Sequence, residues 1–211
     1  MRNFAKIFIN AILAGLGIGI AGTVFLRVKE PLVGSWLFGF GLLTIVVFGF
    51  KLFTGVIGYL GIQGRNTPRY ALECAVIWAG NLVGTSLVGL LIRASRVFPS
   101  FSERIDGMVA EKLADGPLSI FILAVFCGLL MYIAVDTFKR KELEAPVRLA
   151  VLFLCVVVFI LSGFEHCIAN MYYFAVSASF GEAHTRSWLG IMTAGNAVGG
   201  MLLPWADLLR K

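Results

Sequence analysis

The sequence predicts an all-α integral membrane protein of six spans, built as two inverted three-helix repeats with one broken helix in each. Three observations support this prediction. Hydrophobic residues make up 59% of the 211-residue chain and charged residues only 14%, whereas soluble domains are about one-quarter charged. Apolar segments long enough to cross a bilayer recur along the chain. A Gly-Asn-x-Val-Gly motif occurs in the third and in the last of these segments.

Six apolar segments are expected as membrane spans, at residues 4–26, 33–60, 70–92, 118–138, 147–176 and 188–209. Two of them, 33–60 and 147–176, are longer than the about 20 residues that a plain span needs. Both also carry polar residues in their interior, such as Thr54 in the first and His166 in the second. We therefore predict helices at 33–50 and 56–60 with irregular backbone at 52–55, and a second interruption at Glu165 and His166. Irregular backbone at membrane depth is tolerated where protein or a cavity covers it.

The orientation follows from the basic residues, which membrane proteins concentrate on the cytoplasmic side. One predicted side, which includes both termini, carries Arg2, Lys6, Arg65, Arg69, Lys139, Arg140, Lys141, Arg148, Arg210 and Lys211. The other side carries fewer: Arg27, Lys29, Arg93, Arg96, Arg104, Lys112 and Arg186. We expect a multi-pass protein of the cell (inner or plasma) membrane with cytoplasmic N- and C-termini. The scattered basic residues fit a lipid bilayer as partner, and no nucleic acid is expected.

The repeated motif, at 80–84 and 195–199, divides the chain into two similar units within a single transmembrane domain, residues 1–211. Each copy follows an interrupted segment by roughly thirty residues, so repeat one covers about 1–94 and repeat two about 118–211. Three spans per unit give the two units opposite orientations. In such inverted repeats the solute site lies near the bilayer midplane, between the broken helices.

Glu165 and His166 lie at a depth where ionisable groups are costly, and such groups usually face protein or a water-filled path. One interpretation is a polar pair that holds one helix against another. The other is a solute path with His166 at its centre. For Glu165 we expect a structural role, in which its carboxylate accepts hydrogen bonds from backbone N–H groups at the break.

The residues at 163–171, Gly-Phe-Glu-His-Cys-Ile-Ala-Asn-Met, closely resemble the signature of the formate/nitrite transporter family. Gly41-Leu42 followed by the residues at 52–55 resembles the second-helix motif of that family, and 80–84 its third-helix motif. The resemblance implies an aquaporin-like fold, assembled as a homopentamer with one pore per subunit. It also implies passage of small monovalent anions of weak acids: formate, nitrite, hydrosulfide, and sometimes acetate or lactate. No cofactor and no metal are expected.

The resemblance also assigns residues to the path. His166 is similar to the central pore histidine of the family, and Thr54 to the polar residue that faces it. Asn196 corresponds to a hydrogen-bond partner of that histidine, and Lys112 to a lysine in the vestibule. Apolar constrictions are expected on the two sides of His166: Leu42 and Leu52 or Phe53 on one side, and Phe159 on the other. The polar neighbours of His166 in the signature, Glu165 and Asn170, are the remaining candidates.

Two residues depart from the family pattern. Lys51 stands where an acidic residue usually precedes Leu-Phe-Thr, and Tyr132 stands where the fourth helix usually has Asn. A lysine in an apolar segment must reach the interface, form an ion pair or face water. We expect Lys51 either to pair with Glu165 or to face the path.

Two mechanisms are open for His166. An unpaired charge is very costly in a narrow apolar ring. The anion of a weak acid can avoid this cost if it takes a proton and crosses as the neutral acid. In one mechanism His166 supplies or takes the proton, because its charge changes near physiological pH. In the other, His166 stays neutral, held by Asn196, and only donates hydrogen bonds.

Two other classes of function were considered. An aquaporin-like channel for small neutral solutes such as water or ammonia is the alternative, and the excess of 18 Lys+Arg over 12 Asp+Glu argues against it. A membrane-embedded enzyme would need a metal cluster or a nucleophile–base pair. The chain has only two histidines, no Cys/His ligand spacing and no His-Glu-x-x-His motif, so an enzyme is not expected.

Overall fold

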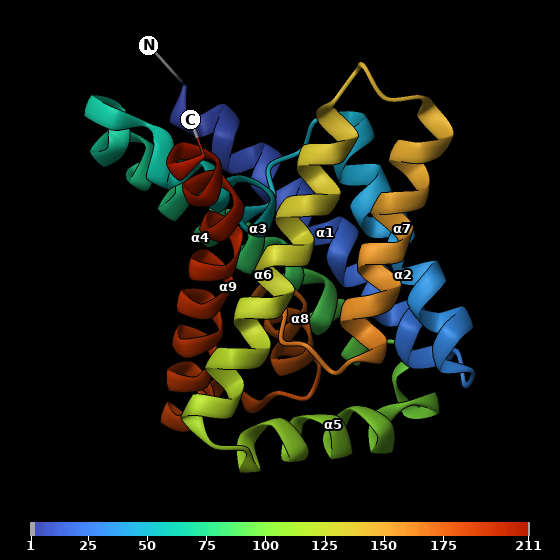
Figure 1. Ribbon diagram of the computed structural model, residues 1–211. Coiled ribbons are helices and arrows are strands. Elements are labelled where there is room, and N and C mark those ends of the chain that lie inside the picture. Colours follow the sequence, from blue (N-terminus) through green and yellow to red (C-terminus); the bar gives the residue numbers. More distant parts are fainter. Residues whose placement is uncertain (1–2, 211) are drawn as a thin grey trace.

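The computed structural model describes residues 3–210 as a bundle of helices (Figure 1). The long helices are α1 (Phe4–Arg27), α2 (Pro31–Phe48), α4 (Thr67–Arg93), α6 (Pro117–Lys139), α7 (Ala145–Leu161) and α9 (Ala183–Leu209). The short helices are α3 (Phe53–Val56), α5 (Ser102–Ala114) and α8 (Cys167–Val176). Short 3-10 helices complete the connections: η1 (Ile57–Ile62), η2 (Gly64–Asn66), η3 (Phe98–Ser100) and η4 (Ser179–Gly181).

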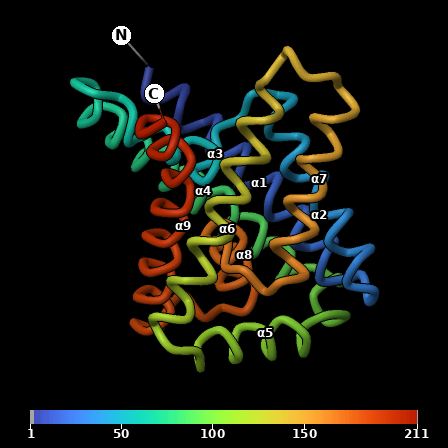
Figure 2. The backbone as a smooth tube through the Cα atoms, in the orientation of Figure 1, coloured from blue at the N-terminus to red at the C-terminus, as the bar shows by residue number. Residues whose placement is uncertain are grey.

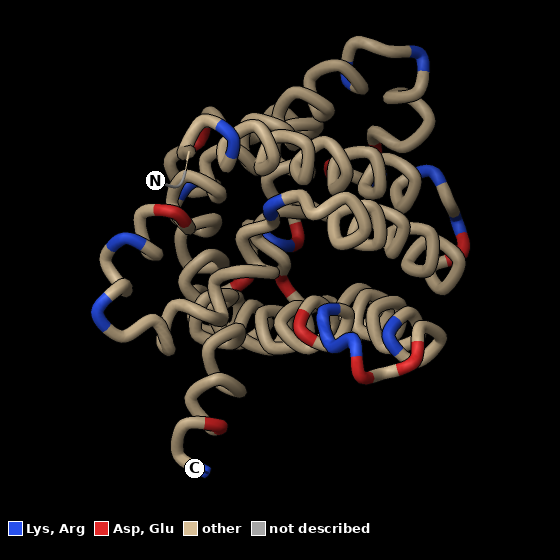
Figure 3. Tube along the Cα trace, turned by 90° about the horizontal axis from the view of Figure 1, so that it is seen from above, with Lys and Arg blue, Asp and Glu red and all other residues tan. Residues whose placement is uncertain are grey.

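The helices have the length and composition of a membrane protein. Within residues 3–210, four helical stretches are long and apolar enough to cross a bilayer: Phe4–Arg27, Pro31–Phe48, Gly64–Arg93 and Pro117–Lys139. Large apolar side chains such as Phe40, Leu91 and Leu118 are exposed on the outside of the bundle. Charged residues are few and lie mostly in loops and at helix ends (Figure 3). The outer surface therefore fits contact with lipid or with further subunits.

The start of α1 and the end of α9 lie at the same end of the bundle, and α5 lies across the opposite end (Figures 1 and 2). This arrangement is compatible with the predicted orientation. Arg2 and Lys211, two of the basic residues used for that prediction, lie outside the described residues. Arg104 anchors α5, because its Nη1 donates to the carbonyls of Phe25 and Leu26 at the end of α1, each at 3.1 Å.

Both predicted breaks are present, but the first was placed a few residues too late. The helix α2 ends at Phe48, and α3 begins at Phe53. The irregular backbone is therefore 49–52, not 52–55. The cause is Gly49, which adopts a left-handed conformation with φ of 70° and ends α2 as a C-terminal cap, a place that favours glycine because it lacks Cβ.

The second break has the same construction. Gly163, with φ of 68°, follows α7, and the N–H of Phe164 then donates to the carbonyl of Phe159 at 3.0 Å. In the first break the N–H of Phe50 donates to the carbonyl of Ile45 at 2.9 Å. The sequence Gly49–Phe53 thus corresponds position by position to Gly163–Cys167. This places Leu52 in the first break at the position that His166 occupies in the second.

The glycines of the repeated motif allow close helix packing in both halves. A Cβ built on Gly80 of α4 would lie 2.6 Å from Ala11 Cβ of α1, and one on Gly195 of α9 would lie 2.6 Å from Ala124 Cβ of α6. The pairs α1–α4 and α6–α9 therefore pack through equivalent positions, as small residues permit in lipid. These matched contacts support the proposed internal repeat.

Candidate functional site

The two breaks meet inside the bundle, through the residues at the start of α3 and just before α8. Thr54, in the first turn of α3, and His166, the residue before α8, are both buried. The Thr54 Oγ1 atom lies 2.9 Å from His166 Nε2. Thr54, which the family resemblance implied to face His166, is therefore in direct contact with it.

The hydrogen bond at the other ring nitrogen fixes the tautomer of His166. The backbone N–H of Ala169 donates to His166 Nδ1 at 3.0 Å, so the imidazole caps the N-terminus of α8. Because Nδ1 accepts this bond, the ring hydrogen of a neutral imidazole lies on Nε2, which donates to Thr54 Oγ1. Protonation of Nδ1 would bring two hydrogens face to face and break the cap.

Asn81 and Asn196, the asparagines of the repeated motif, bind the backbone of the two breaks. The Oδ1 atom of Asn81 accepts from the N–H of Phe53 at 2.9 Å, and its Nδ2 donates to the carbonyls of Lys51 and Ala11, each at 2.8 Å. These bonds tie the first break to α1. They also give hydrogen-bond partners to its backbone groups at a depth where water is scarce.

Asn196 makes the same contacts in the second half. It accepts from the N–H of Cys167 at 2.8 Å and donates to the carbonyls of Glu165 at 2.8 Å and Ala124 at 2.7 Å. The expected hydrogen bond from Asn196 to the His166 side chain is wrong, because all these bonds go to the backbone on either side of His166. The motif that contains Asn81 is evident in the sequence, but nothing local in the sequence indicates that its amide binds the first break.

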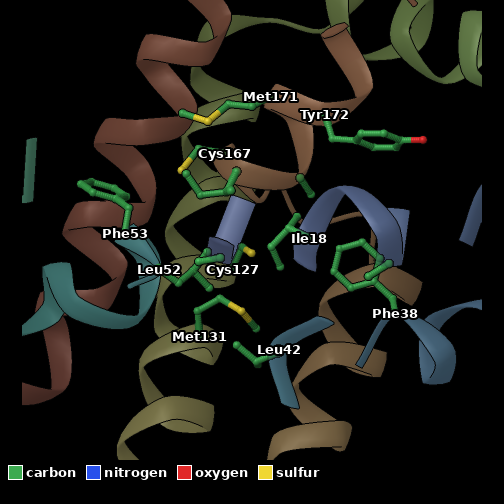
Figure 4. Packing of buried hydrophobic residues seen from close by; sticks show 14 of the residues in the cluster. Ile18, Phe38, Leu42, Leu52, Phe53, Cys127, Met131, Cys167, Met171 and Tyr172 are labelled. Carbon is green, nitrogen blue, oxygen red and sulfur yellow. The ribbon is translucent and has the colours of Figure 1, made fainter. Parts of the chain in front are cut away.

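Apolar side chains surround the Thr54–His166 contact. Figure 4 shows Leu42 of α2, Leu52 of the first break and Met131 of α6 pointing toward one another, while Phe53 points away from them. On the other side the Phe159 ring stacks on His166, with 5.6 Å between the ring centroids. Leu42, Leu52, Phe53 and Phe159 are all buried, but Leu52 lines the cavity on the side of the two termini and Phe53 does not, so Leu52 fits the predicted constriction.

Glu165 forms an ion pair with Lys112. The Lys112 Nζ atom of α5 lies 2.7 Å from Glu165 Oε1 and 2.8 Å from Oε2, and Asn170 Nδ2 donates to Oε2 at 2.7 Å. The expectation that the Glu165 carboxylate binds backbone N–H groups is therefore wrong. The expected pair of Lys51 with Glu165 is also wrong, because the two residues lie in different breaks and line different cavities.

Two cavities lie on opposite sides of the contact. The α5-side cavity has a volume of about 620 Å³, and its lining includes Lys112, Phe159, Glu165, His166 and Asn170. The terminal-side cavity, on the side where α1 begins and α9 ends, has a volume of about 140 Å³ and is lined by residues that include Lys51, Leu52 and Lys139. Between them lie the apolar side chains and the Thr54–His166 contact.

Tyr132 packs beside the first break. Its ring meets the ring of Tyr59 edge-on, with centroids 5.4 Å apart, and lies against Gly58, where a Cβ would collide with it. Tyr132 is not among the described residues that line either cavity. Tyr132, the departure from the family pattern in α6, is therefore a residue that packs against η1.

The sequence matches the sequence model of a known protein family, and this match shows to which family the chain belongs. The model described as formate/nitrite transporter matches residues 1–206. The chain belongs to the formate/nitrite transporter family. Its relatives in this family include the nitrite transporter NirC of Escherichia coli (strain K12), which is 28% identical over 183 residues, or 81% of this chain and 68% of that protein. The formate channel FocA of the same strain is 32% identical over 186 residues, which cover 79% of this chain and 64% of that channel.

Solved structures of this fold agree with the assignment. The chain superposes with a TM-score of 0.80 on a pentameric formate channel with formate bound, at 24% identity over 98% of this chain and 97% of the other. It superposes with the same TM-score on an ion channel of the formate/nitrite transporter family, at 25% identity, over 95% and 86% of the two chains. The all-α membrane fold is thus that of formate/nitrite transporter channels.

Proposed function

We propose that this protein carries small monovalent anions of weak acids across the cell membrane, with formate and nitrite as the first candidates. The observation that carries the proposal is the Thr54–His166 contact, at 2.9 Å, between two cavities and within an apolar wall. The named relatives are a nitrite transporter and a formate channel, which supports the same class of substrate.

Weak acids fit this path because their charge can be removed. A small anion would lose most of its water beside Leu42, Leu52 and Phe159, and an unpaired charge there costs several kcal/mol or more. The anion of a weak acid can take a proton and cross in the neutral form. The anion of a strong acid has no such route, so the apolar wall selects for weak acids.

Of the two mechanisms for His166, the hydrogen bonds favour the neutral donor. The Nδ1 atom already accepts the N–H of Ala169, so a second ring proton would disrupt the start of α8. We infer that the proton accompanying the anion comes from water in the cavities. His166 Nε2 then gives the solute a hydrogen bond at the narrowest point, and Thr54 is its resting partner.

On the α5 side, the Lys112 ammonium and the Asn170 amide both bind Glu165. We propose that this ion pair shapes the wall of the α5-side cavity next to His166. Its net charge is near zero, so it offers donors to an arriving anion without a strong field of its own.

The proposal is tested by solute entry into proteoliposomes. Formate and nitrite are expected to enter rapidly, hydrosulfide and acetate also to enter, and chloride and glycerol to be excluded as in protein-free liposomes. Swelling after an osmotic step, followed by light scattering, measures all of these solutes. Rapid glycerol entry would indicate a channel for neutral solutes, and chloride entry as fast as formate entry would contradict the selection for weak acids.

We also propose a homopentamer with a path in each subunit, whose two termini are cytoplasmic. The exposed apolar surface and the likeness to a pentameric formate channel support this assembly. The mass of the complex in mild detergent, measured by native mass spectrometry, is expected to equal five chains of 22.9 kDa. A mass of one chain under conditions that retain function would contradict it.

A further inference from the structure

The two cavities differ in the sign of the charges that line them, and this difference suggests a binding site beyond the proposed function. The charged residues that line the α5-side cavity are Lys112 and three acids, Glu111, Asp115 and Glu165. The charged residues that line the terminal-side cavity are two bases, Lys51 and Lys139. The smaller cavity is therefore the positive end of the path.

The matched breaks explain how this contrast arises. Lys51 occupies the position in the first break that Glu165 occupies in the second, because Asn81 and Asn196 bind the carbonyls of these two residues in the same way. Glu165 receives a counter-ion from the protein, Lys112 of α5. Lys51 receives none, since within residues 3–210 its ammonium group forms no ion pair.

Lys139 adds a second positive charge to the same cavity. Its Nζ atom lies 4.5 Å from the centroid of the Tyr59 ring and donates to the Tyr59 hydroxyl at 3.3 Å. The nearest acid, Asp136, already accepts from Tyr59 at 2.8 Å and pairs with Arg140 at 2.8 Å. Lys51 and Lys139 border the same small cavity, so a small anion between them would reduce the repulsion between their two positive charges.

Lys51 also borders a separate cavity, together with Lys6 and the acid Glu73. Within residues 3–210 Lys51 forms no ion pair with Glu73. In the terminal-side cavity the charged residues among the described lining are the two lysines. Its volume of about 140 Å³ has space for an anion of three heavy atoms and a few waters, since one water takes about 30 Å³ of liquid.

We propose that Lys51 and Lys139 form a binding site for a small monovalent carboxylate or nitrite, which loads the path from the side of the two termini. This inference rests on the proposed function for its role in transport. The backbone of residue 51 is held through its own N–H and carbonyl, by Asn10 and Asn81. The side chain is therefore free to act on a ligand, and its replacement leaves the break intact.

The test measures uptake of radiolabelled formate against concentration for Lys51→Met, Lys139→Met and the double variant. Each single change is expected to raise the half-saturating concentration about three- to tenfold, with the maximal rate retained, because the lost charge acts on loading alone. Lys141→Met is the matched control: it removes the same charge from the next loop, outside the cavity lining, and is expected to change nothing. Lys51→Arg is expected to keep most of the wild-type affinity.

Binding is measured separately, so that the site is judged even if the protein does not carry formate. Formate labelled with carbon-13 is titrated into the purified oligomer, and broadening of its NMR signal is expected to decrease in the double variant and to persist in Lys141→Met. Equal broadening in these two variants would overturn the site. A double variant that transports with unchanged half-saturation, or that loses maximal rate alone, would also overturn it. Absence of uptake by the wild type, with the binding difference present, would count against the proposed function only.

Discussion

Formate flux through a His166→Phe variant is expected to fall about a hundredfold or more, because loss of a hydrogen-bond donor at a dry constriction costs about 3 kcal/mol. Phenylalanine fills the space of the imidazole but leaves Thr54 as the remaining polar side chain at the contact. It also removes the acceptor for the Ala169 N–H. Initial flux in proteoliposomes, at equal amounts of assembled protein, measures the effect. Flux within threefold of the wild type would mean that His166 does not lie on the path.

His166→Asn separates hydrogen bonding from titration. Asparagine is a favoured N-cap residue, so its side-chain oxygen can accept the bond that His166 Nδ1 accepts, and its amide offers a donor. If His166 acts as a neutral donor, the Asn variant is expected to keep much of the flux and the shape of its dependence on external pH. A flattened pH profile in the Asn variant would instead show that His166 itself supplies the proton, the first of the two mechanisms left open by the sequence.

Lys112→Met is expected to destabilise the protein by about 3–5 kcal/mol, the cost of leaving a buried charge without its partner. The exposed fraction of the Glu165 side chain is only 5%, and that of Lys112 is 16%. Without the ammonium, the side-chain donor that remains to the Glu165 carboxylate within residues 3–210 is the Asn170 amide. Thermal unfolding in detergent, followed by loss of the intact oligomer, measures the difference.

A second substitution tests whether the effect belongs to the ion pair. The double variant Lys112→Met with Glu165→Gln is expected to recover part of the lost stability, because no uncompensated charge remains. Glu111→Gln is the control, since Glu111 lines the same cavity but belongs to no ion pair among the described residues. A Lys112→Met variant as stable as the wild type would show that solvent satisfies Glu165 and that the pair is not structural.

Much of the fold could be predicted because its signals are local. Apolar length indicated the spans, and the two long segments with interior polar residues indicated the breaks. The first break was misplaced because the chain has 24 glycines, and a single glycine does not show by itself that it adopts a left-handed conformation. A Gly-Phe pair stands at the start of both breaks, at Gly49 and Gly163, and comparison of the two would have located the first correctly.

The site was harder to predict because its contacts join distant segments. A sequence can place Asn196 near His166, but it cannot say whether the amide meets the ring or the backbone on either side of it. Lys112 lies 53 positions before Glu165, and only the path of α5 across the end of the bundle brings them together. The error about Lys51 has the same origin, since the inverted halves place Lys51 and Glu165 at opposite cavities.

The way in which Asn81 and Asn196 hold the breaks has a consequence for engineering this protein. Both amides bind main-chain atoms alone, on either side of Leu52 and His166. The hydrogen bonds that hold the two breaks therefore do not depend on which side chain stands between the held peptide groups, apart from the helix cap that His166 adds. Libraries of buried side chains of similar volume at these two positions can sample new permeability profiles while the backbone hydrogen bonds of the breaks are kept.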